Sequence, residues 1–433
     1  MWSELDGRID PKYNNYIYKY KVILNNSIKL GSLLIGTPMY GANESAVKYN
    51  GNCRYIRITD IDKYGILKDD KISSAENEEI KYKIELNDIL IARSGATVGK
   101  SYIHEDDTLN AIFAGYMIRF KIDNLKVNPK YIFYFTQLNI YKQWTEAIQR
   151  SAGQPNINAE EYSDLDIPNI SIEEQNNIVN IMNTAYKIKE QKEQKVKELL
   201  NSIDSYILEK LCINLPQIED KKVTIINCSN LVGNRIDAIY HCQNIDFDNI
   251  LSSSLYTSEI LRNISILEKG SSIIKSNTLY GNIPVIGGGQ VSPYTHNSKT
   301  HNGNVITISS SGAYAGYIWH HDYPIWASDC SVIYSKNELK INTIFLSYIL
   351  KSIQKFFYTL QKGAGQPHVY ISDFSLLKIP IPPINIQNEI NTKIYDISNK
   401  AKQLQIEAID ILENTKEEVE NIILGDKNGK YKI

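Results

Sequence analysis

The chain has 433 residues, enough for two or three domains with ample core. Its formal net charge of −2 at pH 7 argues against a globally basic nucleic-acid binder, so any DNA contact must come from local patches or from partners. The start Met1-Trp2-Ser3-Glu4 does not look like a signal peptide, no apolar run approaches a membrane span, and the five scattered cysteines form no CxxC pair. These features predict a protein of the reducing cytoplasm without membrane contact.

The first part of the chain is typical of a mixed sheet with short helices. Strands are predicted at 55–58, 88–92 and 116–120, followed by a helix over 129–148. The segment 94–101, Ser-Gly-Ala-Thr-Val-Gly-Lys-Ser, resembles a phosphate-binding loop, but that motif needs Gly at its first position and a helix after it. Ser94 stands at that position and the following residues do not look helical, so we interpret the segment as a glycine-rich sheet turn.

One long helix is predicted from Ser171 to Leu211. Ser171 and Glu174 have the spacing of a capping box, and no Pro or Gly interrupts the helix. Its apolar residues recur mostly every three or four positions, which indicates a narrow seam. The seam includes Ile181, Ile188, Val196, Leu200, Ile203 and Ile207.

The next part of the chain repeats the sheet-and-helix pattern. Strands are predicted at 283–286, 305–308 and 331–334, and a helix over 341–359. The glycines 287–289 are interpreted as a turn, because no helix or acidic partner follows at the spacing of a dinucleotide site. The histidines are too irregularly spaced for a zinc site, and Pro382-Pro383 lacks the flanking residues of an amino-methyltransferase loop. The sequence therefore predicts no catalytic machinery and no metal.

A second long helix is predicted over 385–425, with a matching seam at Ile390, Ile394, Ile397, Leu404 and Ile411. Burying one such side chain stabilises by roughly 1.5–3 kcal/mol, so two helices that would each expose a seam favour pairing with each other. The pattern predicts an antiparallel coiled coil within one chain, a spacer of roughly 60 Å. The alternative is two ordinary core helices in separate domains.

Short motifs recur in the same order in both halves of the chain, and their spacing drifts in one direction, as two copies with different loop insertions would produce. The matched pairs are Arg8-Ile9-Asp10-x-x-Tyr13 with Arg235-Ile236-Asp237-x-x-Tyr240, Ser94-Gly95-Ala96-x-x-Gly99 with Ser311-Gly312-Ala313-x-x-Gly316, Ala152-Gly153-Gln154-Pro155 with Ala364-Gly365-Gln366-Pro367, and Ile167-Pro168 with Ile379-Pro380. Gln175 and Gln387 follow at the head of each long helix.

The predicted fold class is therefore α+β. Two repeated mixed α/β globules are separated by two long antiparallel coiled-coil helices and related by an approximate two-fold axis. The expected domains are 1–170 and 214–384 for the globules, 171–213 and 385–425 for the helices, and a tail over 426–433.

In their paired order, these motifs resemble the specificity subunits of type I restriction-modification systems, over nearly the whole chain. The resemblance implies two target-recognition domains, each reading one half of a split double-stranded DNA site, with the helices fixing the gap and docking two methyltransferase subunits. In that family the methyltransferase partners modify adenine N6 with S-adenosylmethionine, and motor-nuclease subunits join to cut unmodified DNA. No cofactor is expected on this chain itself.

Base recognition needs donors and acceptors such as Arg, Asn and Gln, while Lys and backbone amides hold phosphates. On this basis the predicted DNA contacts are Lys48, Arg54, Arg93, Lys100, Gln154 and Asn156 in the first globule and Lys275, Asn277, Gln290, Lys299, Ser310, Tyr314, Gln366 and His368 in the second. Gln154 and Gln366 occur in both copies, so they cannot explain different preferences, and the variable loops 41–52 and 280–303 are better candidates for base recognition.

Two alternatives remain open at this point. One is the specificity subunit of a combined restriction-methylation enzyme that cuts on both sides of its site, which a neighbouring helicase-nuclease gene would argue against. The other is a coiled-coil scaffold without a DNA role, which would not need two diversified globules.

Overall fold

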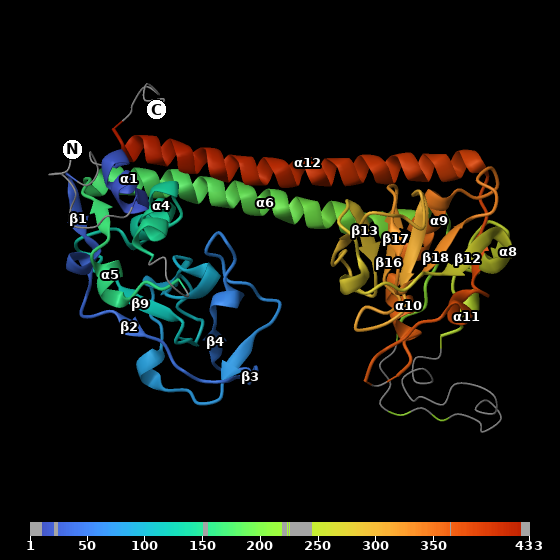
Figure 1. The fold of residues 1–433 in the computed structure, drawn as a ribbon, viewed down its shortest axis with the longest axis horizontal. Coiled ribbons are helices and arrows are strands. Elements are labelled where there is room, and N and C mark those ends of the chain that lie inside the picture. The colour runs from blue at the N-terminus through green and yellow to red at the C-terminus, as the bar shows by residue number, and fades with distance from the viewer. Residues whose placement is uncertain are drawn as a thin grey trace. The chain divides into compact units, whose positions relative to one another are not determined.

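The computed structural model describes residues 11–20, 25–149, 155–218, 223, 225, 245–363 and 365–425. The chain divides into two compact units (Figure 1), and each is described here by itself. The first unit comprises residues 1–193 and 405–433, and the second comprises residues 194–404. The motif around Arg8 and its match around Arg235, the predicted contact Gln154 and the tail 426–433 lie outside the described residues.

The first unit is built on a four-stranded antiparallel sheet of order β2-β9-β6-β7, beside the parallel pair β4-β8 and the antiparallel pairs β1-β10 and β3-β5. Its helices and strands are α1 (Pro11–Lys19), β1 (Ser27–Lys29), β2 (Met39–Tyr40), β3 (Ala46–Lys48), β4 (Arg54–Ile56), β5 (Ser73–Ala75), β6 (Asp88–Ala92), β7 (Ser101–Ile103), β8 (Ala111–Phe113), β9 (Met117–Lys121), α3 (Pro129–Phe135), α4 (Asn139–Ile148), α5 (Ala159–Ser163) and β10 (Asp166–Pro168), with parts of α6 (Ile172–Lys210) and α12 (Ile384–Ile423).

The second unit has the antiparallel sheet β12-β18-β15-β16, the three-stranded sheet β14-β13-β17 and the antiparallel pair β11-β19. Besides the remaining parts of α6 and α12, its helices and strands are β11 (Ser258–Ile260), α8 (Leu261–Ile264), β12 (Ser265–Lys269), β13 (Ile283–Ile286), β14 (Thr295–His296), β15 (Val305–Ser309), β16 (Ile318–His321), β17 (Trp326–Ala327), β18 (Cys330–Ser335), α9 (Thr343–Ser352), α10 (Gln354–Thr359), α11 (Ile371–Phe374) and β19 (Lys378–Pro380).

The two units repeat one topology, as the paired motifs predict. In each four-stranded sheet the central strands pair in equivalent register, with Ile89 opposite Phe120 in the first unit and Ile306 opposite Ile333 in the second. The parallel pair β4-β8 has its counterpart in β13-β17, and β1-β10 has its counterpart in β11-β19. The six predicted strands match β4, β6, β9, β13, β15 and β18 to within two residues.

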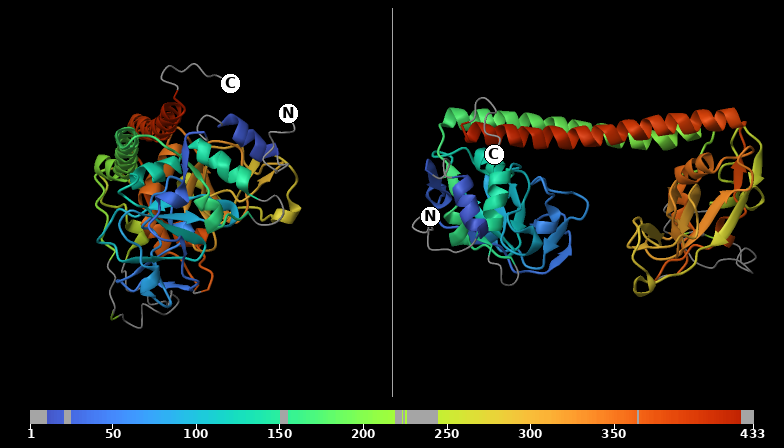
Figure 2. Two further views of the ribbon diagram at one scale, coloured as in Figure 1. Left: turned by 90° about the vertical axis from the view of Figure 1, so that its left-hand side faces the viewer. Right: turned by 45° about the horizontal axis from the view of Figure 1, so that its top comes forward.

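Each unit contains one part of each long helix, and the two parts lie side by side (Figure 2). In the first unit Met182 of α6 and Leu412 of α12 belong to the same buried core as Phe120 and Trp144. In the second unit the core contains Ile207 of α6 and Ile394 of α12, together with a cluster of phenylalanines (Phe345, Phe356, Phe357 and Phe374). Because the helix segments are part of the cores, each globule and its helix segments form one packed body.

The predicted seam differs from the structure at two places. Leu200 is 44% exposed and its neighbour Leu199 is half-buried instead, while Leu412 is fully buried and the predicted Ile411 is only half-buried. The cause is helical geometry, because a straight α-helix advances 3.6 residues per turn and drifts away from a strict seven-residue repeat. Of the remaining seam positions, Val196, Ile207, Ile390 and Ile394 are buried, and Ile181, Ile188, Ile203, Ile397 and Leu404 are half-buried.

The single helices predicted over 129–148 and 341–359 are each broken in two, which corrects that prediction. In the first unit the break follows Phe135, where Gln137 donates a hydrogen bond to the Ser101 hydroxyl on β7 (2.7 Å). In the second unit the break is at Ile353, and the next residue, Gln354, accepts a hydrogen bond from the amide of Ile318 on β16 (2.9 Å). Each break places a glutamine against the sheet, and residue periodicity does not report such a contact.

The glutamine at the head of each long helix ties that helix to its globule. In the first unit the Gln175 side chain accepts from the Asn128 amide (2.9 Å) and donates to the Ile170 carbonyl (3.0 Å). In the second unit the Gln387 side chain accepts from the Asn342 amide (3.0 Å) and donates to the carbonyls of Lys340 and Pro382 (2.8 and 2.9 Å). Asn128 and Asn342 are the N-caps of α3 and α9, so this junction is repeated as well.

The predicted capping box at the start of α6 is present. Glu174 accepts from the Ser171 amide (3.0 Å), and the Glu174 amide donates to the Ser171 hydroxyl (3.2 Å). Over the described ranges, no helix is both long and apolar enough to cross a membrane.

Candidate nucleic-acid interface

The glycine-rich turn of the first unit forms a compact backbone arrangement with the segment that precedes α5. The Gly95 amide donates to the Pro155 carbonyl (2.9 Å), the Ile157 amide donates to the Arg93 carbonyl (2.9 Å), and the Gly99 amide closes the turn on the Ala92 carbonyl (3.0 Å). We call residues 92–99 with 155–157 the first frame. It brings Arg93 next to Asn156, although more than sixty residues separate them in the sequence.

The second unit repeats these bonds one for one. The Gly312 amide donates to the Pro367 carbonyl (2.9 Å), the Val369 amide to the Ser310 carbonyl (3.1 Å), and the Gly316 amide to the Ser309 carbonyl (2.7 Å). We call residues 309–316 with 367–369 the second frame. The isolated bridge between Ser94 and Asn156 likewise has its counterpart between Ser311 and His368.

Two glycines in each frame have a backbone conformation that other residues rarely adopt. Gly95 and Gly99 have φ of 76° and 85°, and Gly312 and Gly316 have φ of 83° and 91°. The turn in the first unit is a short 3₁₀ helix, Gly95–Thr97, that leads into strand β7. A phosphate-binding loop would lead into a helix, so the interpretation as a sheet turn is confirmed.

Three of the predicted contacts in the first unit lie at its surface. Asn156 is exposed on the frame, and Lys48 is exposed on β3 in the variable loop 41–52. The Arg93 guanidinium lies over the ring of Tyr40, 4.8 Å from its centroid, and is half-buried. Tyr40 is 39% exposed, so the pair presents a planar cation on an aromatic ring at the edge of the frame.

The other two described candidates in the first unit, Arg54 and Lys100, bind groups of their own globule. Arg54 is only 4% exposed, and its guanidinium binds Asp69 (2.9 Å) and the carbonyl of Lys68. The Lys100 ammonium donates to the carbonyls of Ile58 (3.2 Å) and Ile61 (2.7 Å), and burial lowers its pKa. Both side chains hold the loop after β4. Arg54 is buried there, which corrects its predicted role, whereas Lys100 is half-buried and its DNA contact stays a prediction.

In the second unit the predicted contacts fall into two groups. Ser310, Tyr314 and His368 belong to the second frame, and Gln366 directly precedes its second segment; Tyr314 and Gln366 are exposed and the other two are half-buried. Lys275, Asn277, Gln290 and Lys299 are exposed in the loops between β12 and β15. The His368 ring stacks on that of Tyr370, with centroids 5.8 Å apart and planes 8° apart.

Sequence reasoning did not select four other residues at the frames: Tyr40 and Tyr116 in the first unit, and Asp329 and Tyr370 in the second. The Arg93 amide donates to the Tyr116 carbonyl (2.9 Å), and the Ser310 amide donates to the Asp329 carbonyl (3.2 Å). Tyr116 and Asp329 therefore occupy equivalent positions, immediately before β9 and β18. Aligning the two copies by their strands as well as by their glycines would have paired them.

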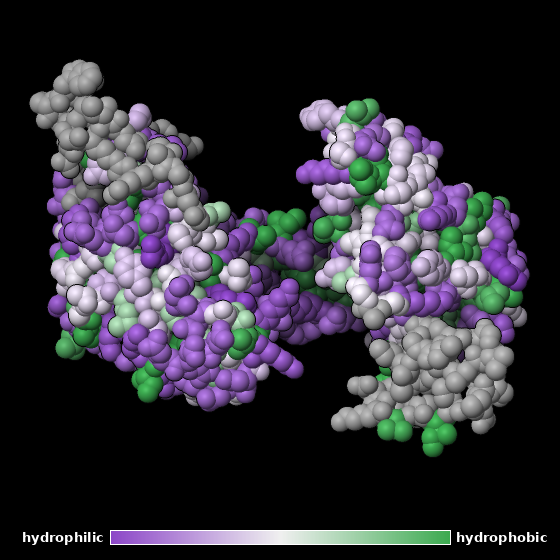
Figure 3. Space-filling model, turned by 60° about the horizontal axis from the view of Figure 1, so that its bottom comes forward, coloured by the Kyte–Doolittle hydropathy of each residue, from purple (hydrophilic) through white to green (hydrophobic). Residues whose placement is uncertain are grey.

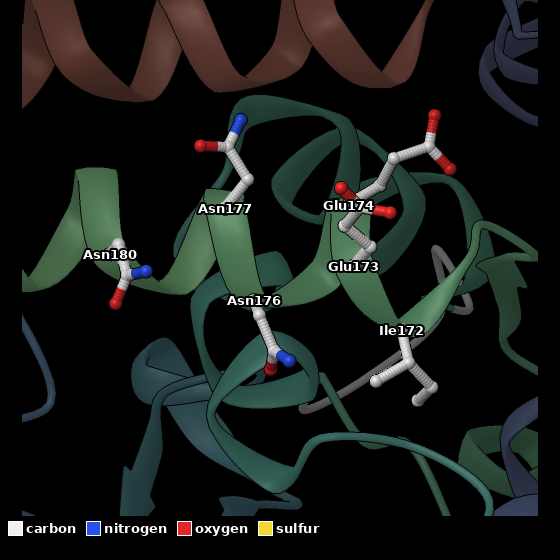
Figure 4. A pocket seen from close by; sticks show the side chains of 6 residues that line it. All are labelled: Ile172, Glu173, Glu174, Asn176, Asn177 and Asn180. Carbon is white, nitrogen blue, oxygen red and sulfur yellow. The ribbon is translucent and has the colours of Figure 1, made fainter.

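Two hollows in the described part of the first unit lie away from its frame. One, of about 670 Å³, lies on the first turns of α6 and is lined by Ile172, Glu173, Glu174, Asn176, Asn177 and Asn180 (Figure 4). Its two carboxylates would repel phosphate, which disfavours DNA there. On the face shown in Figure 3, hydrophobic residues are scattered among hydrophilic ones in both units.

Two histidines of the second unit, His321 and His301, are bound to neighbouring side chains. His321 is fully buried, and its Nε2 is 2.9 Å from the Thr307 hydroxyl, while His301 Nε2 is 2.7 Å from Glu268. Among the residues that the structure describes, no group of three or more His, Cys, Asp and Glu side chains is arranged to hold a metal ion.

The fold and the frames thus define a class of protein: a duplicated mixed α/β module that presents one backbone arrangement with two different sets of surface side chains. A family model, the type I restriction modification DNA specificity domain, matches residues 27–201 and 260–420. These two segments make up most of the chain and coincide with the two copies. The chain belongs to this family.

The chain is also similar to individual proteins. The chain is 33% identical over 98 residues to the specificity subunit of the type I restriction enzyme MjaVIII of Methanocaldococcus jannaschii, an alignment that spans 23% of each protein. A chain solved in a study of assembly and conformational transition of the type I restriction-modification system has a TM-score of 0.53 at 12% identity, covering 92% of this chain and 97% of that one. The specificity subunit of M. genitalium aligns over 92% and 95% of the two chains, with 16% identity and a TM-score of 0.46.

Proposed function

We propose that this chain is the non-catalytic DNA-specificity subunit of a type I restriction-modification enzyme and that it reads an asymmetric, two-part DNA target. The observation that carries the proposal is the repeated frame. The same three backbone hydrogen bonds recur in both units, while Arg93 and Asn156 in the first are replaced by Ser310 and His368 in the second. A shared backbone arrangement that carries different side chains is what recognition of two unlike half-sites requires.

The length of the two long helices supports the proposal of a gap between the half-sites. They contain 39 and 40 residues, so each is roughly 60 Å long, and the pairing seen within each unit continues along an antiparallel coiled coil in this proposal. Ion pairs support that pairing, with Lys192 2.6 Å from Glu407 in the first unit and Lys210 2.6 Å from Glu389 in the second. B-DNA presents the same face about every 34–36 Å, so two modules fixed to such a spacer would read separated patches and ignore the bases between them.

Partners complete the activity. The family assignment supports docking of two methyltransferase subunits, which would transfer a methyl group to adenine N6 from S-adenosylmethionine, and of motor-nuclease subunits that cut unmodified DNA. The net charge of −2 fits this division, because affinity for DNA grows with the number of phosphates that are neutralised. A combined restriction-methylation enzyme would use the same binding modules with a different catalytic partner, and the genes next to this one would tell the two apart.

Mapping N6-methyladenine across the genome tests the proposal, in cells that carry this chain with and without the neighbouring methyltransferase. We expect a split motif with two unlike halves only when both are present. A palindromic motif would contradict the asymmetric target. If a methyltransferase that binds this chain gives no motif at all, the two units would have to be protein-binding modules on a helical scaffold.

A further inference from the structure

Tyr116 and Asp329 occupy the same backbone position in the two units and carry unlike side chains. Tyr116 directly precedes β9, and its carbonyl accepts a hydrogen bond from the Arg93 amide; Asp329 directly precedes β18, and its carbonyl accepts a hydrogen bond from the Ser310 amide. Tyr116 is 65% exposed and Asp329 is exposed. The first lies beside Arg93 and Ser94, and the second lies beside Ser310 and Ser311.

The Asp329 carboxylate is oriented by its neighbours. Its Oδ2 accepts a hydrogen bond from the Ser311 hydroxyl. Gly288 passes close by, since a Cβ at that position would come within 3.4 Å of the same Oδ2 and 2.5 Å of the Ser311 carbonyl oxygen. Oδ1 makes no hydrogen bond to any residue that the structure describes. The carboxylate therefore presents its other oxygen, Oδ1, as a hydrogen-bond acceptor next to the second frame.

The chemistry of an ionised carboxylate limits what it can meet on DNA. It repels phosphate and accepts hydrogen bonds but donates none. In the major groove the hydrogen-bond donors are the amino groups of cytosine (N4) and adenine (N6), and Asp or Glu typically accepts from cytosine N4. Guanine N7 and O6 and thymine O4 are acceptors and would be rejected.

We propose that Asp329 is a specificity-determining residue that accepts a hydrogen bond from the amino group of a cytosine or adenine in the half-site read by the second unit, and that Tyr116 occupies the corresponding reading position for the other half-site. This inference rests on the proposed function. It assigns base selection to positions that share a backbone and differ in side chain, since features identical in both copies cannot encode two different half-sites.

The test uses the full chain with its methyltransferase partner and compares adenine-methylation motifs. Asp329→Asn can still accept from Ser311 but presents an amide that also donates. We expect one base position of one half-site to lose its cytosine or adenine requirement, with discrimination falling about ten-fold or more. The other half-site and the gap should stay unchanged. Asp322→Asn is the matched control. Asp322 is also exposed, but it follows His321, which pairs with Val305 at the end of β15 away from the frame.

Tyr116→Ala is the reciprocal variant and should alter only the half-site that Asp329→Asn leaves intact. The inference is overturned if Asp329→Asn leaves the motif identical, or if the two variants change the same half. It is also overturned if Asp329→Asn and Ser311→Ala both merely lower methylation uniformly, since the carboxylate would then only stabilise the turn. A wild-type complex that gives no split motif would instead overturn the proposed function.

Discussion

Replacing Gln387 by alanine should loosen the junction between α12 and the second globule. Gln387 is fully buried, and three hydrogen bonds join its amide to Asn342, Lys340 and Pro382. The substitution leaves one amide and two carbonyls without these bonds. A buried polar group left unsatisfied costs about 1–3 kcal/mol, and water entering the gap can replace part of the loss, so we expect a total of about 3 kcal/mol.

Differential scanning calorimetry and hydrogen exchange would measure the effect. For a unit of this size, about 3 kcal/mol lowers the melting temperature of the second unit by roughly 6–12 °C. Exchange should quicken in the first turns of α12 and at the start of α9. Gln175→Ala, which removes two hydrogen bonds from the first unit, should have a smaller effect there. Gln403→Ala, at an exposed position of α12, is the control. If Gln387→Ala melts like Gln403→Ala, the account of the junction is refuted.

Three further predictions concern packing, pH and DNA affinity. Tyr64 is 7% exposed, and its ring centroid lies 4.4 Å from Lys189 Nζ and 5.2 Å from Lys416 Nζ. Its buried hydroxyl has no hydrogen-bond partner in the described structure. Thermal melts should therefore show Tyr64→Phe to be neutral or stabilising and Tyr64→Ala to be destabilising by about 3 kcal/mol. Burial, and to a smaller extent the neighbouring His320, lowers the pKa of His321 to about 3. Because the unfolded chain binds the proton more readily, the stability of the fold should decrease as the pH drops from about 6.5 towards 3. In His321→Gln this decrease should be less steep. The isolated chain should bind a target duplex at least ~10-fold more weakly than the complex at equal salt, and equal affinities in fluorescence anisotropy would contradict this.

The sequence predicts the architecture well because that information is repeated and local. The paired glycine motifs find the frames, and the strand patterns locate the sheets. A capping box and the absence of Pro and Gly place α6 to within a residue at each end. These signals depend on neighbours along the chain or on comparing one copy with the other.

Predictions failed where tertiary contacts decide the outcome. Arg54 was selected for DNA because arginines at surfaces read guanine, but its partner Asp69 lies in a loop whose path the sequence does not reveal. The breaks after Phe135 and at Ile353 depend on hydrogen bonds to β7 and β16 rather than on helix propensity. Asp329 has no motif around it and is recognised only when the two sheets are superposed strand by strand.

The central claim is that two modules on one chain read two half-sites independently. The most direct test replaces residues 25–170 with the corresponding segment of a family member of known target and maps adenine methylation in cells that contain the methyltransferase. The account predicts a hybrid motif in which one half-site is exchanged, while the other half-site and the gap are retained because the second unit and both helices are intact. An active complex in which both halves change, or neither changes, would contradict it.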